Sequence, residues 1–504
     1  MGGTRQALMM GVDLGTTAIK VIVMTPDGQV SVSASGRYPT RTPRPGWVEQ
    51  NPEDWWEAAV KAIQACTRSI DSSDIAAVSF SGHMSAQVLL DHNGNVLLPS
   101  ILVADARSAE ETRELRERYM KDFVDRTGNE PIDAFTVSKL LWIRRHHPDL
   151  WAQAGVLMFP KDFIRYKLTG EIGTEPTDAG NSLLFDLSTG GWSRDLMEEL
   201  GLRADIFAPI LSSSQITGHI SGEAAALTGL LEGTPVVTGA ADMACSQLGT
   251  GATQAGTLAV TLSTSAQVVL HVDQASPSAA GRVTFHPSAV QGSTYAMGTV
   301  FTGGLGVDWG YRLLSGKSNL AAEDFEAISS LSARMEEIQP GSSGLMFMPF
   351  LGGSGTPYFD PRDRASWLGL STGQPTELLL HSIMEGIAYN IRESMEVFQS
   401  LGQTIHKVHL GGGGSRNKVW AKMIGDVLGK DVFLLNNRDA SALGAAMLAG
   451  VGCGIYPSIA DAVSCVVSTS EPEPFSPSRH QAYDRLYHRY LKAYRMLNEF
   501  YREA

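Results

Sequence analysis

The pattern of apolar and polar positions begins with an alternation that is typical of β-strands. Residues 10–23 predict a strand, a tight turn and a second strand: an apolar run ends around Asp13, Gly15 and two threonines follow, and β-branched residues then resume the alternation. A similar pattern returns at residues 260–272, where Val-x-Leu-x-Thr-Ser-Ala again leads into an apolar run. Only the first copy carries a carboxylate. The repeat predicts two related domains that each present such a hairpin, although so short a repeat can also arise by coincidence.

Longer segments with helical periodicity alternate with predicted strands. A helix is expected to begin at Pro52, with Asn51 as its N-cap, and further helices are expected over residues 110–122, 138–146, 375–399 and 417–428. Buried strands are predicted at residues 75–80, 235–238 and 408–410, and the ends of such strands are where open α/β sheets place ligands. The alternation predicts an α/β fold. We place the domain boundary just after Asp242, so that residues 1–245 form the first domain and residues 246–504 the second.

Composition narrows the class of protein. The chain has 504 residues, of which 43% are hydrophobic and 18% charged, enough for two cores. The net charge of -13, without a long basic run, disfavours nucleic-acid and membrane partners. The four cysteines lack metal-ligand or redox spacing, no stretch is long and apolar enough to span a membrane, and no signal peptide is evident. We therefore expect a cytoplasmic globular enzyme.

The first hairpin carries candidate phosphate chemistry. Gly15, Thr16 and Thr17 can direct backbone N–H groups and two hydroxyls into one small concavity, which suits phosphate oxygens. Asp13 can hold a hydrated Mg²⁺ beside them, and Lys20 adds a cation. A Gly-Thr turn also occurs in hairpins that bind no ligand. These residues alone therefore leave both a phosphate-binding role and a purely structural role open.

Asp242 is a candidate general base. Phosphoryl transfer to a hydroxyl needs a carboxylate that accepts the proton and orients the nucleophile. Asp242 follows a strand and a glycine turn, a position that is also typical of a helix N-cap.

Four successive glycines, at positions 411–414, follow the strand at residues 408–410. They match neither the P-loop nor the dinucleotide-binding spacing, but a backbone without side chains lets a base or ribose lie flat on it, and Asn417 can hydrogen-bond the nucleotide. A flexible turn between strand and helix is the alternative.

His83 and Met84 can contact a ligand at another strand end, although a histidine there is more often structural. The sequence offers little support for a hydrolase, because it shows no nucleophile–histidine arrangement and no metal-ligand spacing.

With these features in place, the chain resembles the FGGY carbohydrate kinases of the actin-like ATPase superfamily, and within them most closely the members that phosphorylate xylulose. The resemblance covers nearly the whole chain and rests on GVDLGTTAIK, GWVEQNPEDWW, FSGHMSA, PSILVADARS, GAADM, TLSTSA, FLGGSGTPYFDP, GGGGSRNKVWAKMIGDVLG and ALGAA. It implies two ribonuclease-H-like domains flanking a deep catalytic cleft, which closes on MgATP and a sugar. The γ-phosphate then passes in line to a sugar hydroxyl.

The resemblance also implies a role for each candidate residue. Asp242 is expected to be the catalytic base and Asp13 the metal ligand. The expected nucleotide-binding residues are Asp13, Thr16, Thr17, Lys20, Thr264, Gly304, Gly413 and Asn417, and the expected sugar-binding residues are Met84, Ser85, Asp105 and Asp242.

The function implied is ATP-dependent phosphorylation of a terminal hydroxyl of a ketopentose, with D-xylulose converted to D-xylulose 5-phosphate. The alternatives are a kinase for ribulose, a tetritol or tetrulose, glycerol or gluconate and, from another class, a non-catalytic ATP-binding regulator. The expected cofactors are ATP and Mg²⁺, and the family suggests a homodimer.

Three departures from the family pattern bear on these expectations. Ser85 and Val103 stand where a histidine and a tryptophan are usual, which suggests a wider sugar pocket. Ser263 and Ala266 replace the glycines of a Gly-Thr-Ser-Gly hairpin, which suggests a strained or reshaped turn. Gly353-Ser354-Gly355 replaces Gly-Glu-Arg before Thr-Pro and removes an ion pair near the cleft.

Overall fold

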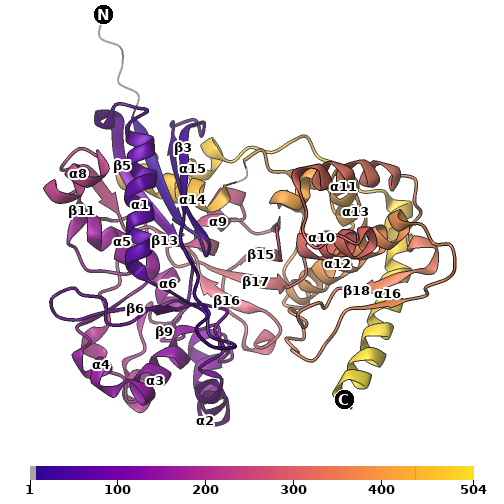
Figure 1. Cartoon of the computed structure of the whole chain (residues 1–504), viewed down its shortest axis with the longest axis horizontal. Coiled ribbons are helices and arrows are strands. Elements are labelled where there is room, and N and C mark those ends of the chain that lie inside the picture. The colour runs from indigo at the N-terminus through magenta and orange to yellow at the C-terminus, as the bar shows by residue number, and fades with distance from the viewer. Residues whose placement is uncertain (1–6, 438, 504) are drawn as a thin grey trace, which may run out of the picture.

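Two sheets with the same strand order form the centres of the two halves of the chain. The computed structural model describes residues 7–437 and 439–503, without the side chains of residues 322 and 329. The first sheet runs β3-β2-β1-β5-β12, with β11 at its edge and β13 beside the end of β5; the second runs β17-β15-β14-β20-β21, with β16 at its edge (Figure 1). In each sheet an antiparallel hairpin is followed by two parallel neighbours. This repeated order confirms the predicted α/β fold with two ribonuclease-H-like domains.

The strands of the first sheet are β1 (Leu8–Leu14), β2 (Ala18–Met24), β3 (Val30–Arg37), β5 (Ile75–Gly82), β11 (Ile216–His219), β12 (Pro235–Val237) and β13 (Ala240–Ala241). Those of the second are β14 (Thr257–Leu262), β15 (Ala266–Val272), β16 (Thr284–Pro287), β17 (Thr294–Val300), β20 (Lys407–Gly411) and β21 (Val432–Leu434). Both repeated segments of the sequence are therefore hairpins, β1–β2 and β14–β15, at equivalent places in the two sheets.

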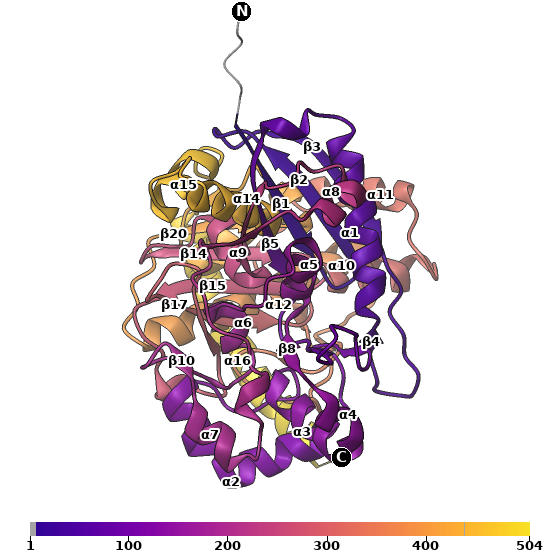
Figure 2. The ribbon, with the colours of Figure 1, turned by 90° about the vertical axis from the view of Figure 1, so that its left-hand side faces the viewer.

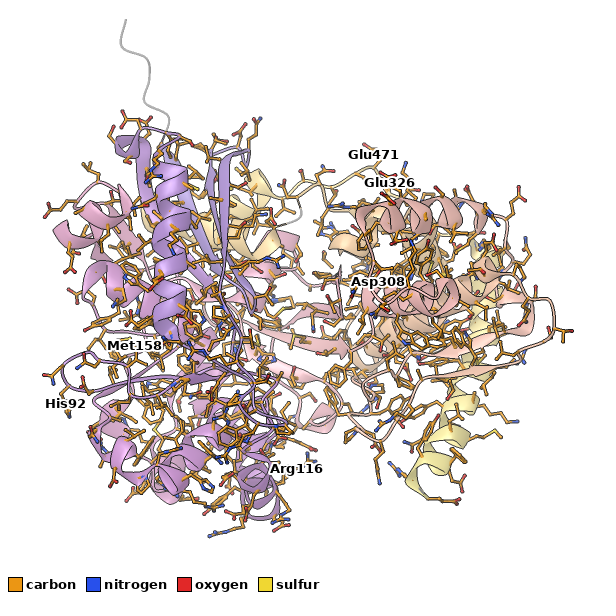
Figure 3. The ribbon with its side chains drawn as sticks, viewed as in Figure 1. His92, Arg116, Met158, Asp308, Glu326 and Glu471 are labelled. Atoms are coloured by element: carbon orange, nitrogen blue, oxygen red, sulfur yellow. The ribbon has the colours of Figure 1, made fainter. Side chains whose placement is uncertain are left out.

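Helices cover the outer face of each sheet. In the first half these are α1 (Pro52–Thr67) and α5 (Pro160–Thr169), on which α8 (Gly222–Thr228) packs; in the second they are α12 (Thr376–Ser400) and α13 (Lys418–Leu428), with α16 (Pro477–Arg502) packed on α13. Asn51 caps α1 as predicted, because its side chain accepts a hydrogen bond from the N–H of Glu53 at 3.3 Å. Figure 3 shows the side chains filling the space between these ribbons.

Two further helices, α9 (Asp242–Thr250) and α14 (Ala440–Gly452), lie between the sheets. Helix α14 packs on β1 and β5 as well as on α9, although it belongs to the second half of the sequence (Figure 2). The two helices cross so closely that a Cβ on Gly444 would lie 2.0 Å from the carbonyl oxygen of Cys245, and one on Gly249 would lie 2.1 Å from that of Ala440. Glycine is thus required at this crossing, and the two halves share one buried core.

A further cluster of apolar side chains joins α2 (Ala109–Thr127), α3 (Thr136–His146), α4 (Pro148–Gln153) and α7 (Arg194–Glu199) below the first sheet. The helices predicted over residues 110–122 and 138–146 correspond to α2 and α3, and the segment from 200 to 233 contains β11 and α8. Within the part of the chain that the structure describes, we find no helix with the length and apolar character to cross a membrane. The domain boundary after residue 245 stays a prediction.

The remaining short elements are β4 (Glu49–Gln50), η1 (Ser72–Asp74), β6 (Val88–Leu90), β7 (Ser100–Ile101), β8 (Val156–Met158), α6 (Pro176–Gly180), β9 (Phe185–Asp186), β10 (Gly191–Trp192), η2 (Ala204–Ile206), η3 (Pro277–Ala279), α10 (Gly304–Ser315), α11 (Ala322–Arg334), η4 (Ser342–Gly344), β18 (Met346–Met348), β19 (Ser366–Leu368), η5 (Gly413–Arg416) and α15 (Ile459–Val466).

Candidate active site

Asp13 lies near the end of β1, half-buried, at the start of the first hairpin turn. Its neighbour across the parallel pair with β5 is Ser81, whose hydroxyl donates to Asp13 Oδ1 at 2.7 Å. Burial raises the pKa of Asp13 to about 6, although the Ser81 hydrogen bond opposes the shift. A carboxylate held in this way is short of positive charge, and it suits a bound cation.

The turn after Asp13 is held through its backbone. The Tyr38 hydroxyl donates to the carbonyl of Gly15, and the Gln50 side-chain amide donates to the carbonyl of Thr16 at 2.7 Å. Gln50 is oriented in turn by the indole N–H of the buried Trp55, which donates to it at 2.8 Å. The residues Thr16 and Thr17 are exposed, so their hydroxyls are accessible to a ligand.

Lys20, the predicted phosphate-binding cation, forms an ion pair. Its Nζ lies 2.6 Å from Asp439 Oδ2, just before α14, and the two side chains are 36% and 39% exposed. The pair joins the first hairpin to the C-terminal half of the chain. Because it is partly exposed, it contributes at most about 1 kcal/mol, and an anionic ligand can compete with Asp439 for the ammonium group.

Asp242 is the first residue of α9. The N-cap position belongs to Ala241, so the interpretation of Asp242 as the cap is wrong. Its Oδ1 accepts a hydrogen bond from the N–H of Met243 at 2.7 Å. Burial and then the negative charge of Asp13 raise the pKa of Asp242 to about 7, against the effect of that hydrogen bond. A carboxylate with a pKa near neutrality is well matched to accept a proton and later release it.

The predicted sugar-binding segment follows the end of β5. Ser85 is buried with a positive φ of 69°, and Met84 is half-buried. The Ser85 carbonyl accepts hydrogen bonds from Lys139 Nζ at 2.9 Å and from the Thr136 hydroxyl at 3.0 Å. Burial lowers the pKa of Lys139 to about 7. Two side chains of α3 therefore fix the backbone of this segment in a conformation that serine rarely adopts.

Before that segment, His83 packs edge-on against Trp55, with 5.2 Å between ring centroids. Burial lowers the pKa of His83 to about 3, so the ring is neutral at pH 7. Its place in the core agrees with the structural interpretation made from the sequence.

Asp105 is buried and engaged in a salt bridge. Its carboxylate accepts from Nε and from a terminal nitrogen of Arg107, at 2.9 and 2.7 Å, and the Val48 N–H also donates to it. The Arg107 guanidinium reaches Glu49 at 2.9 Å and lies 3.8 Å over the Trp47 ring. The visible role of Asp105 is to hold this arrangement, and its contact with a sugar stays a prediction.

The second hairpin turn packs against the start of α10. The N–H of Gly304 donates to the Ser263 carbonyl at 2.6 Å, and a Cβ on Gly304 would lie 2.8 Å from that oxygen. Thr264 is exposed at the tip of the turn. No residue from Ser263 to Ala266 is among those with positive φ in the described chain. The loss of the usual glycines therefore introduces no left-handed backbone strain here, contrary to the expectation from the sequence.

The glycine run at the end of β20 abuts the second hairpin. Gly412 has a φ of 84°, and a Cβ on it would lie 2.5 Å from the carbonyl oxygen of Leu262. Gly413 is exposed, with nothing within 4 Å of the position of a Cβ. The run is therefore a packed platform with one open position.

Asn417 is the N-cap of the helix that follows the glycine run. Its Oδ1 accepts from the N–H of Trp420 at 3.1 Å, and its amide donates to the Ser332 hydroxyl at 2.7 Å. These contacts show a capping role, and contact of Asn417 with a nucleotide stays a prediction.

The structure thus brings the predicted residues into two groups. Asp13 and Asp242 interact electrostatically in the first half, while Thr264, Gly304 and the glycine run lie together in the second.

Three residues that hold these groups in place were not predicted from the sequence. Ser81 lies beside Asp13, and the side chains of Thr177 and Ser441 form hydrogen bonds with the backbone at residues 241 and 242. Ser81 was detectable as a polar residue at a strand end, but nothing in the sequence singled out Thr177 or Ser441.

Two family models cover most of the chain. Residues 8–249 match the N-terminal domain, and residues 251–453 the C-terminal domain, of the FGGY family of carbohydrate kinases. The chain therefore belongs to the FGGY family of carbohydrate kinases, and it is a sugar kinase that uses ATP.

The similar proteins include kinases for more than one sugar. The chain is 33% identical over 490 residues to the xylulose kinase of Bacillus subtilis (strain 168), and the match covers 96% of both proteins. It is 27% identical over 469 residues to the gluconokinase of the same strain, covering 92% of this chain and 90% of that protein. The crystal structure of xylulose kinase from Rhodospirillum rubrum superimposes with a TM-score of 0.90 at 30% identity, covering 98% of this chain and all of that one (100%).

Proposed function

We propose that the protein transfers the γ-phosphate of ATP to a terminal hydroxyl of a ketopentose, converting D-xylulose to D-xylulose 5-phosphate. The proposal is supported by the similarity to xylulose kinases over nearly the full length of the chain. The observation that carries the chemistry is the half-buried Asp242 at the start of α9, beside Asp13 and with a pKa of about 7.

In the proposed reaction, Asp242 accepts the proton of the sugar hydroxyl. The sugar oxygen then forms a bond to the γ-phosphorus as the bond from that phosphorus to the bridging oxygen of ADP breaks. Asp242 orients the hydroxyl before transfer and holds its proton afterwards. The helix N-terminus at Asp242 favours the ionised carboxylate that must accept this proton.

Asp13 is the residue that fits Mg²⁺. Its carboxylate is a hard oxygen ligand, and because burial disfavours its charged form, a bound cation would stabilise it. When bound, Mg²⁺ would neutralise charge on the phosphates. We propose that Thr16, Thr17 and Lys20 bind phosphates from the first half, with Thr264 opposite them. Gly304, Gly413 and Asn417 are proposed to line the nucleotide site.

On the sugar side we propose Met84, Ser85 and Asp105 together with Asp242. Val103, which replaces the usual tryptophan, is 39% exposed. The similarity to a gluconokinase makes gluconate the alternative to test first, and ribulose, tetritols and glycerol follow. The cytoplasmic location and the homodimer stay predictions.

The test is ADP release in a coupled assay with MgATP across D-xylulose, D-ribulose, gluconate, erythritol, erythrulose and glycerol, with a control without sugar. We expect the highest kcat/KM with D-xylulose, by about tenfold or more over gluconate, the scale of discrimination that a few polar contacts give. A higher kcat/KM with another sugar would overturn the assignment of D-xylulose as substrate, but it would leave the proposed phosphoryl transfer to a hydroxyl standing. Turnover no higher than the control with every sugar would contradict the catalytic proposal and favour a non-catalytic ATP-binding protein.

A further inference from the structure

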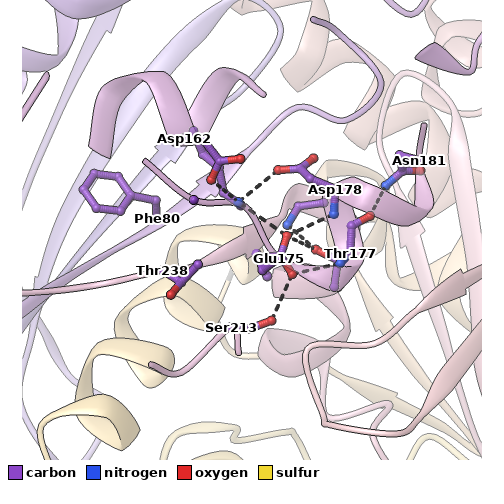
Figure 4. Close-up of polar contacts among 12 residues, drawn as sticks. Phe80, Asp162, Glu175, Thr177, Asp178, Asn181, Ser213 and Thr238 are labelled. Atoms are coloured by element: carbon purple, nitrogen blue, oxygen red, sulfur yellow. Dashed lines mark hydrogen bonds and ion pairs between the residues drawn. The ribbon is translucent and has the colours of Figure 1, made fainter. Parts of the chain in front are cut away.

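A cluster of buried ionisable side chains joins α5 to the start of α6 (Figure 4). Lys161 Nζ is 2.8 Å from Asp162, 3.0 Å from Asp178 and 3.4 Å from Glu175, and all four side chains are at most 1% exposed. We call these four residues the Lys161 cluster. Burial lowers the pKa of Lys161, but the three carboxylates outweigh it and raise that pKa, so the ammonium stays charged.

Such a cluster is unlike an ordinary core. Removing ionisable groups from water offsets much of their mutual attraction, and burial accordingly raises the pKa of Asp178 well above its usual range, so buried ion pairs add little net stability. They do define geometry, because each charge tolerates few alternative positions. In Figure 4 the carboxylates of Asp162 and Asp178 point toward the same nitrogen atom, which is the Nζ of Lys161. Glu175 contacts both this nitrogen and Thr177. The polar contacts of Lys161 therefore continue through Glu175 to Thr177.

Glu175 connects the cluster to a threonine hydroxyl. It is the N-cap of α6 and accepts hydrogen bonds from the N–H groups of Thr177 and Asp178, at 2.8 and 3.0 Å, and from the hydroxyl of Ser213 at 2.9 Å. The Thr177 hydroxyl donates to Glu175 Oε1 at 2.7 Å. Its proton is thereby directed toward Glu175, which leaves the oxygen available as an acceptor on the other side.

That acceptor receives the N–H of Ala241, at 2.7 Å. Ala241 is the N-cap of α9, so the bond ends on the residue directly before Asp242. The strand that leads there, β13, has only two residues and is paired with β5 through Ala240↔Ser81 and Ala241↔Gly82. A Cβ on Gly82 would lie 2.8 Å from Lys161 Cβ, so the cluster also packs directly on this strand end.

We propose that Thr177 is a positioning residue for the reaction: its hydroxyl, oriented by Glu175 and the rest of the Lys161 cluster, fixes the backbone before Asp242 and so places the carboxylate for proton transfer. The proposal rests on the proposed function, in which Asp242 is the base. Thr177 does not touch the substrate in this account. Its effect passes through the Ala241 peptide, and a small displacement there is costly because catalysis depends on the alignment of the reacting groups.

Thr177→Val in the full chain tests the proposal, since valine keeps the shape and removes only the hydroxyl. With MgATP and D-xylulose we expect kcat to fall by about tenfold to a hundredfold, with both KM values within about threefold of the unsubstituted protein. Thr177→Ser is expected to retain kcat within about threefold, because it restores the hydroxyl.

Thr228→Val is the matched control. Thr228 is also fully buried, and its hydroxyl likewise donates one hydrogen bond, here to a backbone carbonyl, and accepts one from a backbone N–H, but it lies on α8 in the outer layer. Thr228→Val should lower the melting temperature about as much as Thr177→Val does, but it should not lower kcat. The proposal is overturned if Thr177→Val keeps kcat within about twofold of the parent, or if Thr228→Val lowers kcat as much.

If Thr177→Val does not fold, Ser213→Ala is the second variant, because it removes a hydrogen bond to Glu175 without changing Thr177. A lower kcat with unchanged KM values would then support the proposal, and an unchanged kcat would overturn it.

Amide hydrogen exchange separates this proposal from the proposed function. Exchange of the Ala241 N–H should be faster in Thr177→Val than in the unsubstituted protein by about tenfold or more, and unchanged in Thr228→Val. If the unsubstituted protein shows no sugar-dependent turnover, the proposed function fails, and the exchange data still decide whether Thr177 fixes this backbone. Equal exchange in all three proteins would overturn the positioning role.

Discussion

The two hairpins, β1–β2 and β14–β15, occupy equivalent places in their sheets yet differ in chemistry. The first carries Asp13, has Lys20 opposite it in the register, and lies close enough to Asp242 for their charges to interact. The second carries no ionisable side chain in its turn and instead packs against the N-terminus of α10 through the Ser263 carbonyl. One hairpin therefore presents charge, and the other presents hydroxyls and backbone groups beside a helix start.

This difference shows how one supersecondary unit can serve two parts of a phosphoryl-transfer site. A cation and the transferred phosphoryl group need charged partners, whereas the remaining phosphates can be bound by backbone N–H groups and helix dipoles. Substitutions in the first hairpin should therefore affect the chemical step, and substitutions in the second should affect ATP binding.

Asp13→Asn should give the largest effect in either hairpin. The amide keeps the shape but removes the negative charge, so kcat is expected to fall by about 10²–10⁴-fold, the scale of losing a main electrostatic element. The apparent KM for Mg²⁺ should rise in the same assay. Steady-state kinetics at several Mg²⁺ concentrations measure both, and an unchanged kcat would refute the assignment of charge chemistry to this turn.

Thr264→Val tests the second hairpin. If Thr264 faces the phosphates as proposed, loss of its hydroxyl should raise the KM for ATP by about tenfold, the value of one hydrogen bond to a charged group, and change kcat by less than about threefold. The KM for the sugar serves as the internal control and should not move. A loss confined to kcat would show that the two hairpins do not divide the work in this way.

Asp242→Asn and pH test the electrostatics of the first half. Because burial raises the pKa of Asp242 to about 7, ionisation of this carboxyl lowers the free energy of unfolding. This destabilisation is absent below pH 4 and grows as the pH rises through 7. Without Mg²⁺, Asp242→Asn should therefore raise the melting temperature at pH 8 by about 2 °C or more and leave it unchanged at pH 4. Calorimetry at the two pH values measures this, and an equal shift at both would contradict a raised pKa.

The double substitution Ser263→Gly with Ala266→Gly should give the smallest effect. It restores the glycines that are usual in the family, but this turn contains no left-handed residue that glycine would relieve. The KM for ATP is expected to stay within about twofold of the parent value, with a slightly lower melting temperature because glycine is more flexible when unfolded. A marked improvement in ATP binding would mean that the turn is strained after all.

The hairpins, α1 and the glycine run were predictable because each has a local signal. Alternation over residues 10–23, the cap at Asn51 and four successive glycines all act within a few residues of chain. Asp13 and Asp242 were likewise identified from strand and turn patterns, with support from the family motifs.

The packing between the halves had no such signal. In the apolar stretch that begins at Leu443, Gly444 permits the close crossing of α14 with α9, but a glycine in an apolar run does not show which helix it contacts. Thr177 and Ser81 became significant only once β13 lay beside β5, because hydrogen bonds between distant segments leave no periodicity in the sequence. The contact of Arg107 with Glu49 is of the same kind.

The most direct test of the central claim is sugar-dependent ADP release by Asp242→Asn compared with the unsubstituted protein, at saturating MgATP and D-xylulose. The account predicts a fall in kcat of about 10²–10⁴-fold, with the dissociation constant of ATP within about threefold. Turnover equal to that of the unsubstituted protein would contradict the assignment of Asp242 as the base.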